Sequence, residues 1–507
     1  MKKFTSSTGK VLLYKGTPDQ SRLEELADGP GDIWHSGLDQ GLTHAFQDLK
    51  YQAAVFWWYI NDFPNCDQSI SWRMPHDEFV VREEIWNLSG KLDQNYIEEL
   101  MQGLDYGYRM LRYAGAVVLH VKGLFASKNH QLEGNDHDLI YFYKKFFKKE
   151  HLLFMSYRKG WNDTLGKIGL LASLKPSFYD QESELVPLRP LEPMDGTPTV
   201  TYIIPTMLRH DMCVNLLNDL AAQTYHPTQV VIVDATPVEK HTVDFTAMEL
   251  PFKVVVQQQI SKGSCKARNE ALELSTGEFV IFGDDDIRME STFVENHIRF
   301  LQTYNADACN GLDIMADHSE QDLSDLAVKK ARLSASFFRA GVSQSFNNAN
   351  SCVRRKWIDK IGFNDVNYDG GYGEDNDYGL RLAKAGATVL YNPYSVNLHL
   401  KPPVGGYRFW GSQAKVTGKK RKKQPWELDD PVTDVVPVPS PTMKYFQLKH
   451  FTPEQNEEFR EIYFIKQATK NGAAGMLHMM RNKSYRKKQY AESMKYAKAL
   501  LKLGERY

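Results

Sequence analysis

The sequence predicts an α/β fold with a parallel sheet, and three observations support this class. Between residues 198 and 290, short apolar runs alternate with amphipathic helical segments. Each run is followed by polar or turn residues, which is typical of strands buried on both faces. Strands that alternate with helices form parallel sheets with helices on their faces. Ligands bind beyond the carboxyl ends of such strands, so the side chains at those ends are the first candidates for a site.

The elements of this alternation can be assigned in chain order. We expect four strands, at 200–206, 229–234, 254–256 and 279–282, and two helices, at 212–223 and 264–275. Thr206 ends the first strand and Asp234 ends the second, and the fourth runs directly into Asp284–Asp286. Because the carboxyl ends of parallel strands lie at one edge of the sheet, the sequence predicts that these side chains form one constellation.

The acidic triplet Asp284–Asp286 is the strongest chemical signal in the chain. Neighbouring carboxylates repel one another and are costly to desolvate unless a cation joins them. Mg²⁺ binds one or two carboxylates together with the phosphates of a substrate. By itself the triplet is equally consistent with a solvated acidic turn. Its place among the other polar strand ends favours a site for a metal-bound diphosphate.

Composition excludes several classes of protein. The formal net charge of −1 gives no general attraction to nucleic acid, so we expect no nucleic-acid partner. The five cysteines are far apart and form no CxxC pair, which argues against a zinc site or a disulfide framework and fits a reducing compartment. The N-terminus has no apolar core of a signal peptide, and the longest apolar block, residues 53–60, is too short to span a bilayer. We expect a soluble or peripheral protein.

Proline-rich stretches divide the chain. We expect an N-terminal domain at 1–175, a linker at 176–197, a catalytic domain at 198–415, and a basic, proline-rich segment with a helical C-terminal extension at 416–507. Residues 53–60 are expected to form a buried strand or core segment, and 138–174 to be helical. The basic residues from Arg481 onward are either a solvated helix face or a contact with anionic lipid.

Two parts of the chain resemble each other. Val81–Gly90 and Val353–Gly362 share a Val-Arg start and a final glycine, and each is followed by Asp-Tyr-Gly-x-Arg, at 105–109 and at 377–381. The common order predicts two copies of one supersecondary unit.

The two copies differ where chemistry is expected. Glu374 and Asp375 in the second copy correspond to Gln102 and Gly103 in the first. The first copy also has no acidic triplet after an apolar strand. The N-terminal region is therefore predicted to be a partial, inactive relative, kept for shape or binding.

Residues 198–400 resemble a family 2 glycosyltransferase with the GT-A nucleotide-sugar fold. The resemblance rests on five motifs in the family's order, which are Ile203-Ile204-Pro205-Thr206, Asp234, Lys262-Gly263 with Ala267-Arg268-Asn269, the acidic triplet, and Gly373-Glu374-Asp375. The Gly-Tyr-Gly-Glu-Asp form further resembles the chondroitin-polymerase and β-galactosyltransferase type. The resemblance implies a Rossmann-like GT-A domain, preceded by a degenerate partial copy and followed by a mostly helical region.

The resemblance also implies roles for individual residues. A Mn²⁺ or Mg²⁺ ion would be held by Asp284, Asp286 and His399. The donor would be bound by Pro205, Thr206, Arg209, Asp234, Lys262, Arg268, Asp284 and Asp285. Asp375 is similar to the family's general base, and Glu374 beside it would orient the acceptor. Asn348 would line the acceptor site, and Trp410, between glycines, would belong to a lid.

The function implied is an inverting, metal-dependent glycosyltransferase in the cytoplasm, peripheral at the inner face of the membrane. It would move a sugar from a nucleotide-sugar donor, UDP-linked by analogy, to a polysaccharide or lipid-linked oligosaccharide acceptor. Two alternatives are a two-site polymerase and a non-catalytic nucleotide-sugar-binding scaffold. Gln102 and Gly103 argue against the first, and the intact acids Asp284–Asp286 and Asp375 argue against the second. The sequence leaves the sugar, the acceptor and the oligomeric state open.

Overall fold

The computed structural model describes residues 1–37, 63, 66–89, 91–126, 135–146, 185–259, 263–343, 346–400, 402, 405–407, 435–469, 472, 475, 477 and 481–507. The segment predicted at 53–60 and most of the helical stretch predicted at 138–174 lie outside these residues. The chain forms two compact units. The first comprises Met1–Leu188, Arg339–Val342 and His450–Glu458, and the second comprises Arg189–Phe338, Ser343–Lys449 and Phe459–Tyr507.

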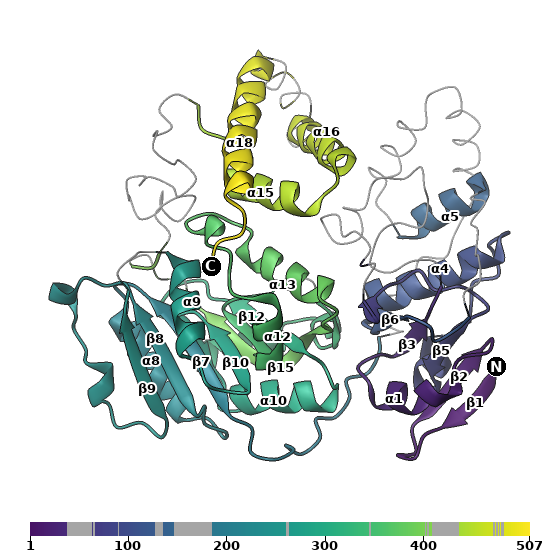
Figure 1. The fold of residues 1–507 in the computed structure, drawn as a ribbon, viewed down its shortest axis with the longest axis horizontal. Coiled ribbons are helices and arrows are strands. Elements are labelled where there is room, and N and C mark those ends of the chain that lie inside the picture. Colours follow the sequence, from purple (N-terminus) through teal and green to yellow (C-terminus); the bar gives the residue numbers. More distant parts are fainter. Residues whose placement is uncertain are drawn as a thin grey trace. The chain divides into compact units, whose positions relative to one another are not determined.

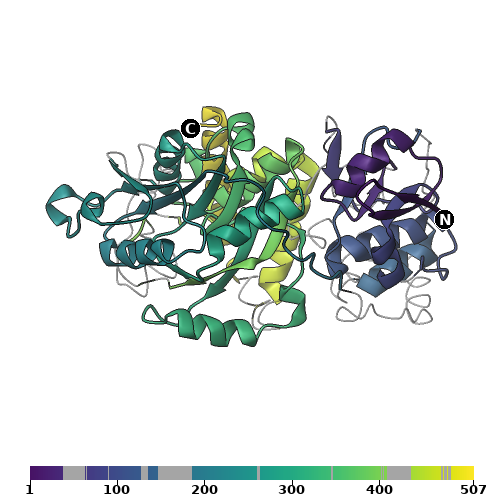
Figure 2. The ribbon, with the colours of Figure 1, turned by 90° about the horizontal axis from the view of Figure 1, so that it is seen from below.

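The first unit contains a sheet with the strand order β1-β2-β5-β3-β6-β4, coloured purple to blue in Figures 1 and 2. Its strands are β1 (Lys2–Thr5), β2 (Val11–Lys15), β3 (Ile33–His35), β4 (Gln68–Ile70), β5 (Phe79–Arg82) and β6 (Val118–Val121). Its helices are η1 (Gln20–Arg22), α1 (Leu23–Asp28), α3 (Glu83–Ser89), α4 (Glu99–Arg109), the π-helical turn η2 (Met110–Ala114) and α5 (Asp136–Phe146). In this sheet β3 and β6 are parallel, and the other neighbours are antiparallel.

The second unit contains a larger sheet with the order β11-β15-β12-β14-β10-β7-β8-β9. Its strands are β7 (Val200–Thr206), β8 (Gln229–Asp234), β9 (Lys253–Gln258), β10 (Phe279–Gly283), β11 (Ile287–Met289), β12 (Ala308–Met315), β14 (Asn350–Arg354) and β15 (Val389–His399). Strands β10, β7, β8 and β9 are parallel neighbours, which confirms the prediction for this part of the chain. Strand β14 is antiparallel to both β10 and β12, so the whole sheet is mixed.

The helices between these strands also match the predicted alternation. They are α8 (His210–Ala221), η3 (Val238–Lys240), η4 (Phe245–Ala247), α9 (Ser264–Leu274), α10 (Phe293–Thr303), α11 (Leu323–Ala331), η5 (Ala335–Phe337), α12 (Arg355–Ile361), η6 (Val366–Tyr368) and α13 (Glu374–Lys384). Helices α15 (Pro441–His450), α16 (Pro453–Thr469) and α18 (Lys483–Leu503) follow, so the described part of the C-terminal region is mostly helical, as predicted. None of the helices in the described parts of the chain is long and apolar enough to cross a bilayer.

One core layer determines where the site forms. Apolar side chains of α9, α12 and α13 pack with those of β7, β8, β10, β14 and β15 in a single buried cluster. Ala267 and Ala271, one helical turn apart on α9, belong to this cluster, as does Tyr378 on α13. Figure 1 shows these three helices beside the strands β7, β10 and β12. The shared layer brings the middle of α9 and the first turn of α13 toward the carboxyl ends of β7 and β10.

Candidate active site

Three predicted metal ligands lie together at the end of β10. The ligand atoms of Asp284, Asp286 and His399 all lie within 4.8 Å of one another. Strand β11 follows the acidic triplet and pairs with β15, and this pairing places Ile287 opposite His399. Residues far apart in the sequence are therefore joined by strand register. His399 Nε2 lies 3.3 Å from Asp286 Oδ1.

His399 is also held from its other side. Its Nδ1 lies 3.2 Å from Asp313 Oδ2 on β12. Burial alone would lower the pKa of His399, but the hydrogen bonds to Asp286 and Asp313 outweigh it and raise the pKa to about 10. In a metal-binding histidine, one ring nitrogen usually bonds a carboxylate and the other faces the remaining metal ligands. Two carboxylates and an oriented imidazole fit a divalent ion such as Mn²⁺ or Mg²⁺.

Two arginines neutralise the acidic triplet in this structure. Arg209 Nη1 donates to Asp285 Oδ1 at 2.9 Å and to Asp286 Oδ2 at 3.0 Å. Arg268 Nη2 donates to Asp284 Oδ1 at 2.7 Å. Arg268 is buried, and its Nε and Nη1 have no hydrogen-bond partner among the described residues. A buried guanidinium with unused N–H groups beside a metal-ligand set is suited to phosphate oxygens.

Both oxygens of Asp285 accept hydrogen bonds from protein groups outside the candidate metal ligands. Oδ1 accepts from Arg209, and Oδ2 accepts from the Thr206 hydroxyl at 2.8 Å. Burial raises the pKa of Asp285 to about 7. At Asp286 burial would also raise the pKa, but the bond to His399 outweighs it and lowers the pKa below its usual range. The triplet therefore contains one carboxylate that tends to hold a proton and one that stays charged.

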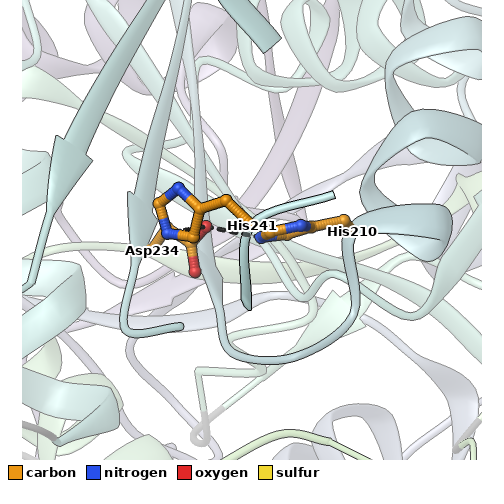
Figure 3. Close-up of side chains that lie close together, drawn as sticks. All are labelled: His210, Asp234 and His241. Carbon is orange, nitrogen blue, oxygen red and sulfur yellow. Dashed lines mark hydrogen bonds and ion pairs between the residues drawn. The ribbon is translucent and has the colours of Figure 1, made fainter. Parts of the chain in front are cut away.

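A second polar cluster lies at the end of β8 and consists of Asp234, His210 and His241. Their ligand atoms also lie within 4.8 Å of one another. Figure 3 shows the Asp234 carboxylate beside both imidazole rings. Asp234 Oδ2 lies 2.7 Å from His210 Nε2 and 3.6 Å from His241 Nε2. Next to the cluster is a cavity of about 410 Å³, lined by Asp234, His241, Thr242, Val243, Asp244, Phe245, Thr246 and Val256.

The predicted general base lies in another cavity, of about 440 Å³, lined by Asn347, Tyr372, Gly373, Glu374, Asp375, Asn376 and Met443. Gly373 has a left-handed φ of +111° and precedes α13, so Glu374 and Asp375 occupy the first turn of this helix. The side-chain amide of Asn348 donates to Asp375 Oδ1. The structure therefore brings Asn348 and Asp375 together.

Some predicted residues cannot be placed, and some site residues were not predicted. Lys262 and Trp410 lie outside the described residues, and Pro205 is buried within β7. Sequence reasoning missed His210 and Asp313 because nothing local distinguishes them. His210 begins α8, and Asp313 lies within β12. It also missed Tyr407, whose hydroxyl donates to the carbonyl oxygen of Thr206 at 3.1 Å.

Comparisons with known proteins identify the central part of the second unit. Residues 201–358 match the family model described as "Glycosyl transferase family 2". Over 95 residues the chain is 28% identical to the putative colanic acid biosynthesis glycosyl transferase WcaA of Escherichia coli K12, covering 18% of this chain and 34% of WcaA. Over 111 residues it is 32% identical to the poly(ribitol-phosphate) beta-N-acetylglucosaminyltransferase TarS of Staphylococcus aureus Mu50, covering 21% of this chain and 19% of TarS.

Solved structures give more distant likenesses. The structure of S. aureus TarS 1–349 in complex with UDP-GlcNAc has 21% identity and a TM-score of 0.32, over 41% of this chain and 60% of that chain. The structure of GalNAc-T7 with UDP, GalNAc and Mn²⁺ has 13% identity and a TM-score of 0.32, over 54% of this chain and 58% of that chain. The chain thus spans about a third of WcaA and a fifth of TarS. The family match includes Asp234, Arg268 and the acidic triplet and ends before Asp375.

Proposed function

Residues 201–358 form a family 2 glycosyltransferase domain of the GT-A type, and from this premise we propose that the protein is an inverting, metal-dependent glycosyltransferase. The donor is a nucleotide sugar linked to UDP, and the acceptor is a polysaccharide or a lipid-linked oligosaccharide. The relative TarS is named a beta-N-acetylglucosaminyltransferase and was solved with UDP-GlcNAc, which supports the choice of donor class.

The observation that carries this proposal is the position of Arg268 between the two halves of the site. Burial alone would lower the pKa of this guanidinium, but the charges of Asp284 and Asp375 outweigh burial and raise it. Arg268 is therefore within electrostatic reach of both a metal ligand and the candidate base. A diphosphate bound at the metal ligands and an acceptor bound at Asp375 would meet at this residue.

The chemistry follows from these positions. In one displacement, the acceptor oxygen attacks the anomeric carbon, the bond from that carbon to the diphosphate oxygen breaks, and the acceptor proton passes to Asp375. Asn348 holds the base carboxylate for this step. Arg268 donates to the departing diphosphate through its unused N–H groups. A divalent ion held by Asp284, Asp286 and His399 would supply Lewis-acid stabilisation of the leaving group.

We place this activity in the cytoplasm, at the inner face of the membrane. The five cysteines are buried and form no disulfide with one another, which suits a reducing compartment. Helix α18 buries Gln489, Ser493, Tyr496, Ala497 and Leu500 on one face. Its lysines and arginines lie largely outside this face and offer a basic surface to anionic lipid headgroups, where a lipid-linked acceptor would be found.

A donor screen tests the proposal. Purified protein is mixed with Mn²⁺ or Mg²⁺ and each common nucleotide sugar, and release of free nucleotide is followed with and without a chelator. We expect slow release from one UDP-sugar that the chelator abolishes, and an inverted anomeric product by NMR once an acceptor is found. No release and no metal-dependent binding of any donor would contradict the proposal and favour a scaffold.

A matched pair of variants makes the metal assignment specific. Asp286→Asn removes a buried candidate ligand, and we expect it to abolish metal-dependent release. Asp317→Asn removes a carboxylate that is 74% exposed and paired with Lys329, and we expect it to change nothing. Equal activity in the two variants would refute the metal site.

A further inference from the structure

The cluster at the end of β8 has a feature that the proposed chemistry does not use. We propose that His241 reads the base of the donor nucleotide by accepting a hydrogen bond from an imide N–H, so that the site selects uracil over cytosine. Asp234 and His210 act as positioning residues for this imidazole. This inference rests on the proposed function, since it concerns the nucleotide of the same donor.

The tautomer of His210 is fixed by its surroundings. The backbone N–H of Thr242 donates to His210 Nδ1 at 3.0 Å, so this nitrogen carries no proton. The proton of the neutral ring is therefore on Nε2, which donates to Asp234 Oδ2 at 2.7 Å. His210 thus joins Asp234 to the loop that begins at His241.

Both oxygens of the Asp234 carboxylate already accept hydrogen bonds from the protein. Its Oδ1 accepts the backbone N–H of Thr236 at 2.8 Å, and its Oδ2 accepts from His210. The residue is only 1% exposed. Asp234 was expected to contact the donor, but these bonds favour a role in holding the histidines.

His241 lines the cavity and is the more exposed of the two histidines. Its side chain is 32% exposed, whereas that of His210 is 3% exposed. His241 Nε2 lies 3.1 Å from the carbonyl oxygen of Thr236, which can only accept, so the proton of the neutral ring is on Nε2. Nδ1 is left as an acceptor, and it forms no hydrogen bond with any residue that the structure describes.

The cavity wall suits a planar base. Phe245 and Val256 supply apolar surface, and the volume of about 410 Å³ lies within the usual range of small-ligand sites. An imidazole acceptor pairs with the N3–H of uracil, which is a donor. It meets a lone pair at N3 of cytosine, so a cytosine base would leave two acceptors facing each other.

The same bonds argue against a metal at this cluster. A metal needs the lone pair of His210 Nε2, but this nitrogen carries the proton while Nδ1 accepts from Thr242. If the proton moved to Nδ1 of His210, this N–H would face the backbone N–H of Thr242, and neither donor would have an acceptor. The cluster is therefore complete without an ion, in contrast to the set that contains His399.

Calorimetry with UDP and CDP in the presence of Mn²⁺ tests the inference on the full chain. We expect the wild type to bind UDP about tenfold more tightly than CDP, since one hydrogen bond is gained or lost. His241→Phe should bring the two affinities to near equality by weakening UDP and leaving CDP unchanged. The control is His226→Phe, because His226 also bonds a backbone carbonyl, that of Ala221 at 3.0 Å, and lines neither of the two cavities.

The outcomes separate this inference from the proposed function. An undiminished preference for UDP in His241→Phe, or equal affinities in the wild type, would overturn the inference while the transferase proposal stands on the donor screen. Loss of the preference in His226→Phe as well would also overturn it, because the effect would not be local. Binding of neither nucleotide, together with a blank donor screen, would overturn both.

Discussion

In the first unit, the buried carboxylate of Asp105 accepts from Tyr96 at 2.8 Å and from Lys145 at 2.7 Å. In the second unit, Asp377 accepts from Tyr368 at 3.2 Å and pairs with Lys449 at 2.7 Å. Each aspartate also pairs with an arginine four residues later, which is Arg109 in one and Arg381 in the other. Two regions far apart in the sequence therefore build the same aspartate cluster.

The match extends beyond the cluster. Lys145 also bonds Asp93 at 2.7 Å, and Lys449 also bonds Asp365 at 3.4 Å. In both units a tyrosine one turn before the lysine bonds the same aspartate, at 3.2 Å for Tyr141 and at 2.6 Å for Tyr445. Helix α5 of the first unit thus corresponds to α15 of the second, which the sequence repeat did not reveal.

The strands agree as well. The order β5-β3-β6 in the first unit and β14-β12-β15 in the second have the same pattern of one antiparallel and one parallel pair. The first copy has one more residue between Arg109 and Gly115 than the second has between Arg381 and Gly386, and the π-helical turn η2 accommodates it. The described part of the first unit has no counterpart of β7, β8 and β9.

The difference between the copies lies at the position of the base. Asp375 lines a cavity, whereas a Cβ on Gly103 would lie 2.5 Å from both His76 N and Met74 O. In the first unit the backbone occupies the space that corresponds to the cavity beside Asp375 in the second. The aspartate cluster is common to both units, and the catalytic role that we propose belongs to the residues that only the second unit adds to it. This supports the proposal that the N-terminal domain is a degenerate, inactive relative.

The largest effect should come from the added base. Asp375→Asn removes the proton acceptor, and we expect transfer to fall by about 10²–10⁴-fold while UDP-sugar binding persists. Steady-state rates and calorimetry with the donor measure the two quantities. Gln102→Ala, at the corresponding position to Glu374 in the first unit, should leave the rate unchanged. Transfer by Asp375→Asn at the wild-type rate would show that Asp375 is not the general base.

Replacing the lysine of each aspartate cluster separates an effect on stability from an effect on catalysis. Lys145 and Lys449 are 7% and 10% exposed. Lys145 neutralises the buried Asp105 and the half-buried Asp93, and Lys449 neutralises the buried Asp365 and Asp377. Replacing either by Met breaks its buried ion pairs, so each change should lower the free energy of unfolding of its unit by about 3–5 kcal/mol. Urea denaturation measures this loss.

Only the second lysine should also affect turnover. Asp377 follows Asp375 on α13 by two residues, so Lys449→Met should displace the base and lower kcat with little change in KM for the donor. Lys449→Arg should recover much of the loss, and Lys145→Met should keep the wild-type kcat in its folded fraction. A drop in kcat shared by both Met variants would mean that the effect is general instability.

Much of this organisation could be predicted from sequence, and the failures have a physical pattern. Apolar runs that end in polar residues identified β7, β8 and β10 and placed the acidic triplet correctly. Three features depend on pairings between distant segments. They are the antiparallel pairing of β14, the contact between Asp313 and His399, and the match of α5 to α15. No local periodicity reports such pairings, so Asp313 looked like any other acid in a strand.

A smaller effect on stability should come from the hydrogen bond that joins Asp369 to the start of α9. Asp369 Oδ1 accepts the backbone N–H of Cys265 at 2.6 Å, at the start of α9, and exposed Ile97 stands at the corresponding place in the first unit. Burial raises the pKa of Asp369 from 3.8 to about 6. Because the folded state binds this proton more tightly, its contribution to stability is complete below pH 3.8 and is lost as pH rises through 6.

Asp369→Asn removes this dependence. Relative to wild type, the free energy of unfolding of Asp369→Asn should rise by about 3 kcal/mol as the pH increases from about 4 to about 7. Urea denaturation of both proteins across this range measures the difference. Asp317→Asn, at an exposed carboxylate, should show no comparable rise. A constant difference between Asp369→Asn and wild type would show that Asp369 is charged in the folded protein throughout.

The last prediction compares the two base positions directly. Ala at either position adds or keeps only a methyl group, so Gly103→Ala and Asp375→Ala place the same Cβ in the two copies. At Gly103 that Cβ would meet the backbone of Met74–His76, which cannot move aside as a side chain can, so we expect a loss of about 1–3 kcal/mol in unfolding free energy. At Asp375 the Cβ is already accommodated beside the cavity, so Asp375→Ala should keep the wild-type melting temperature while losing transfer. Wild-type stability in Gly103→Ala would mean that the first copy has room for a side chain at this position. Its lack of activity would then follow from the missing acids alone, and restoring them would be a reasonable next experiment.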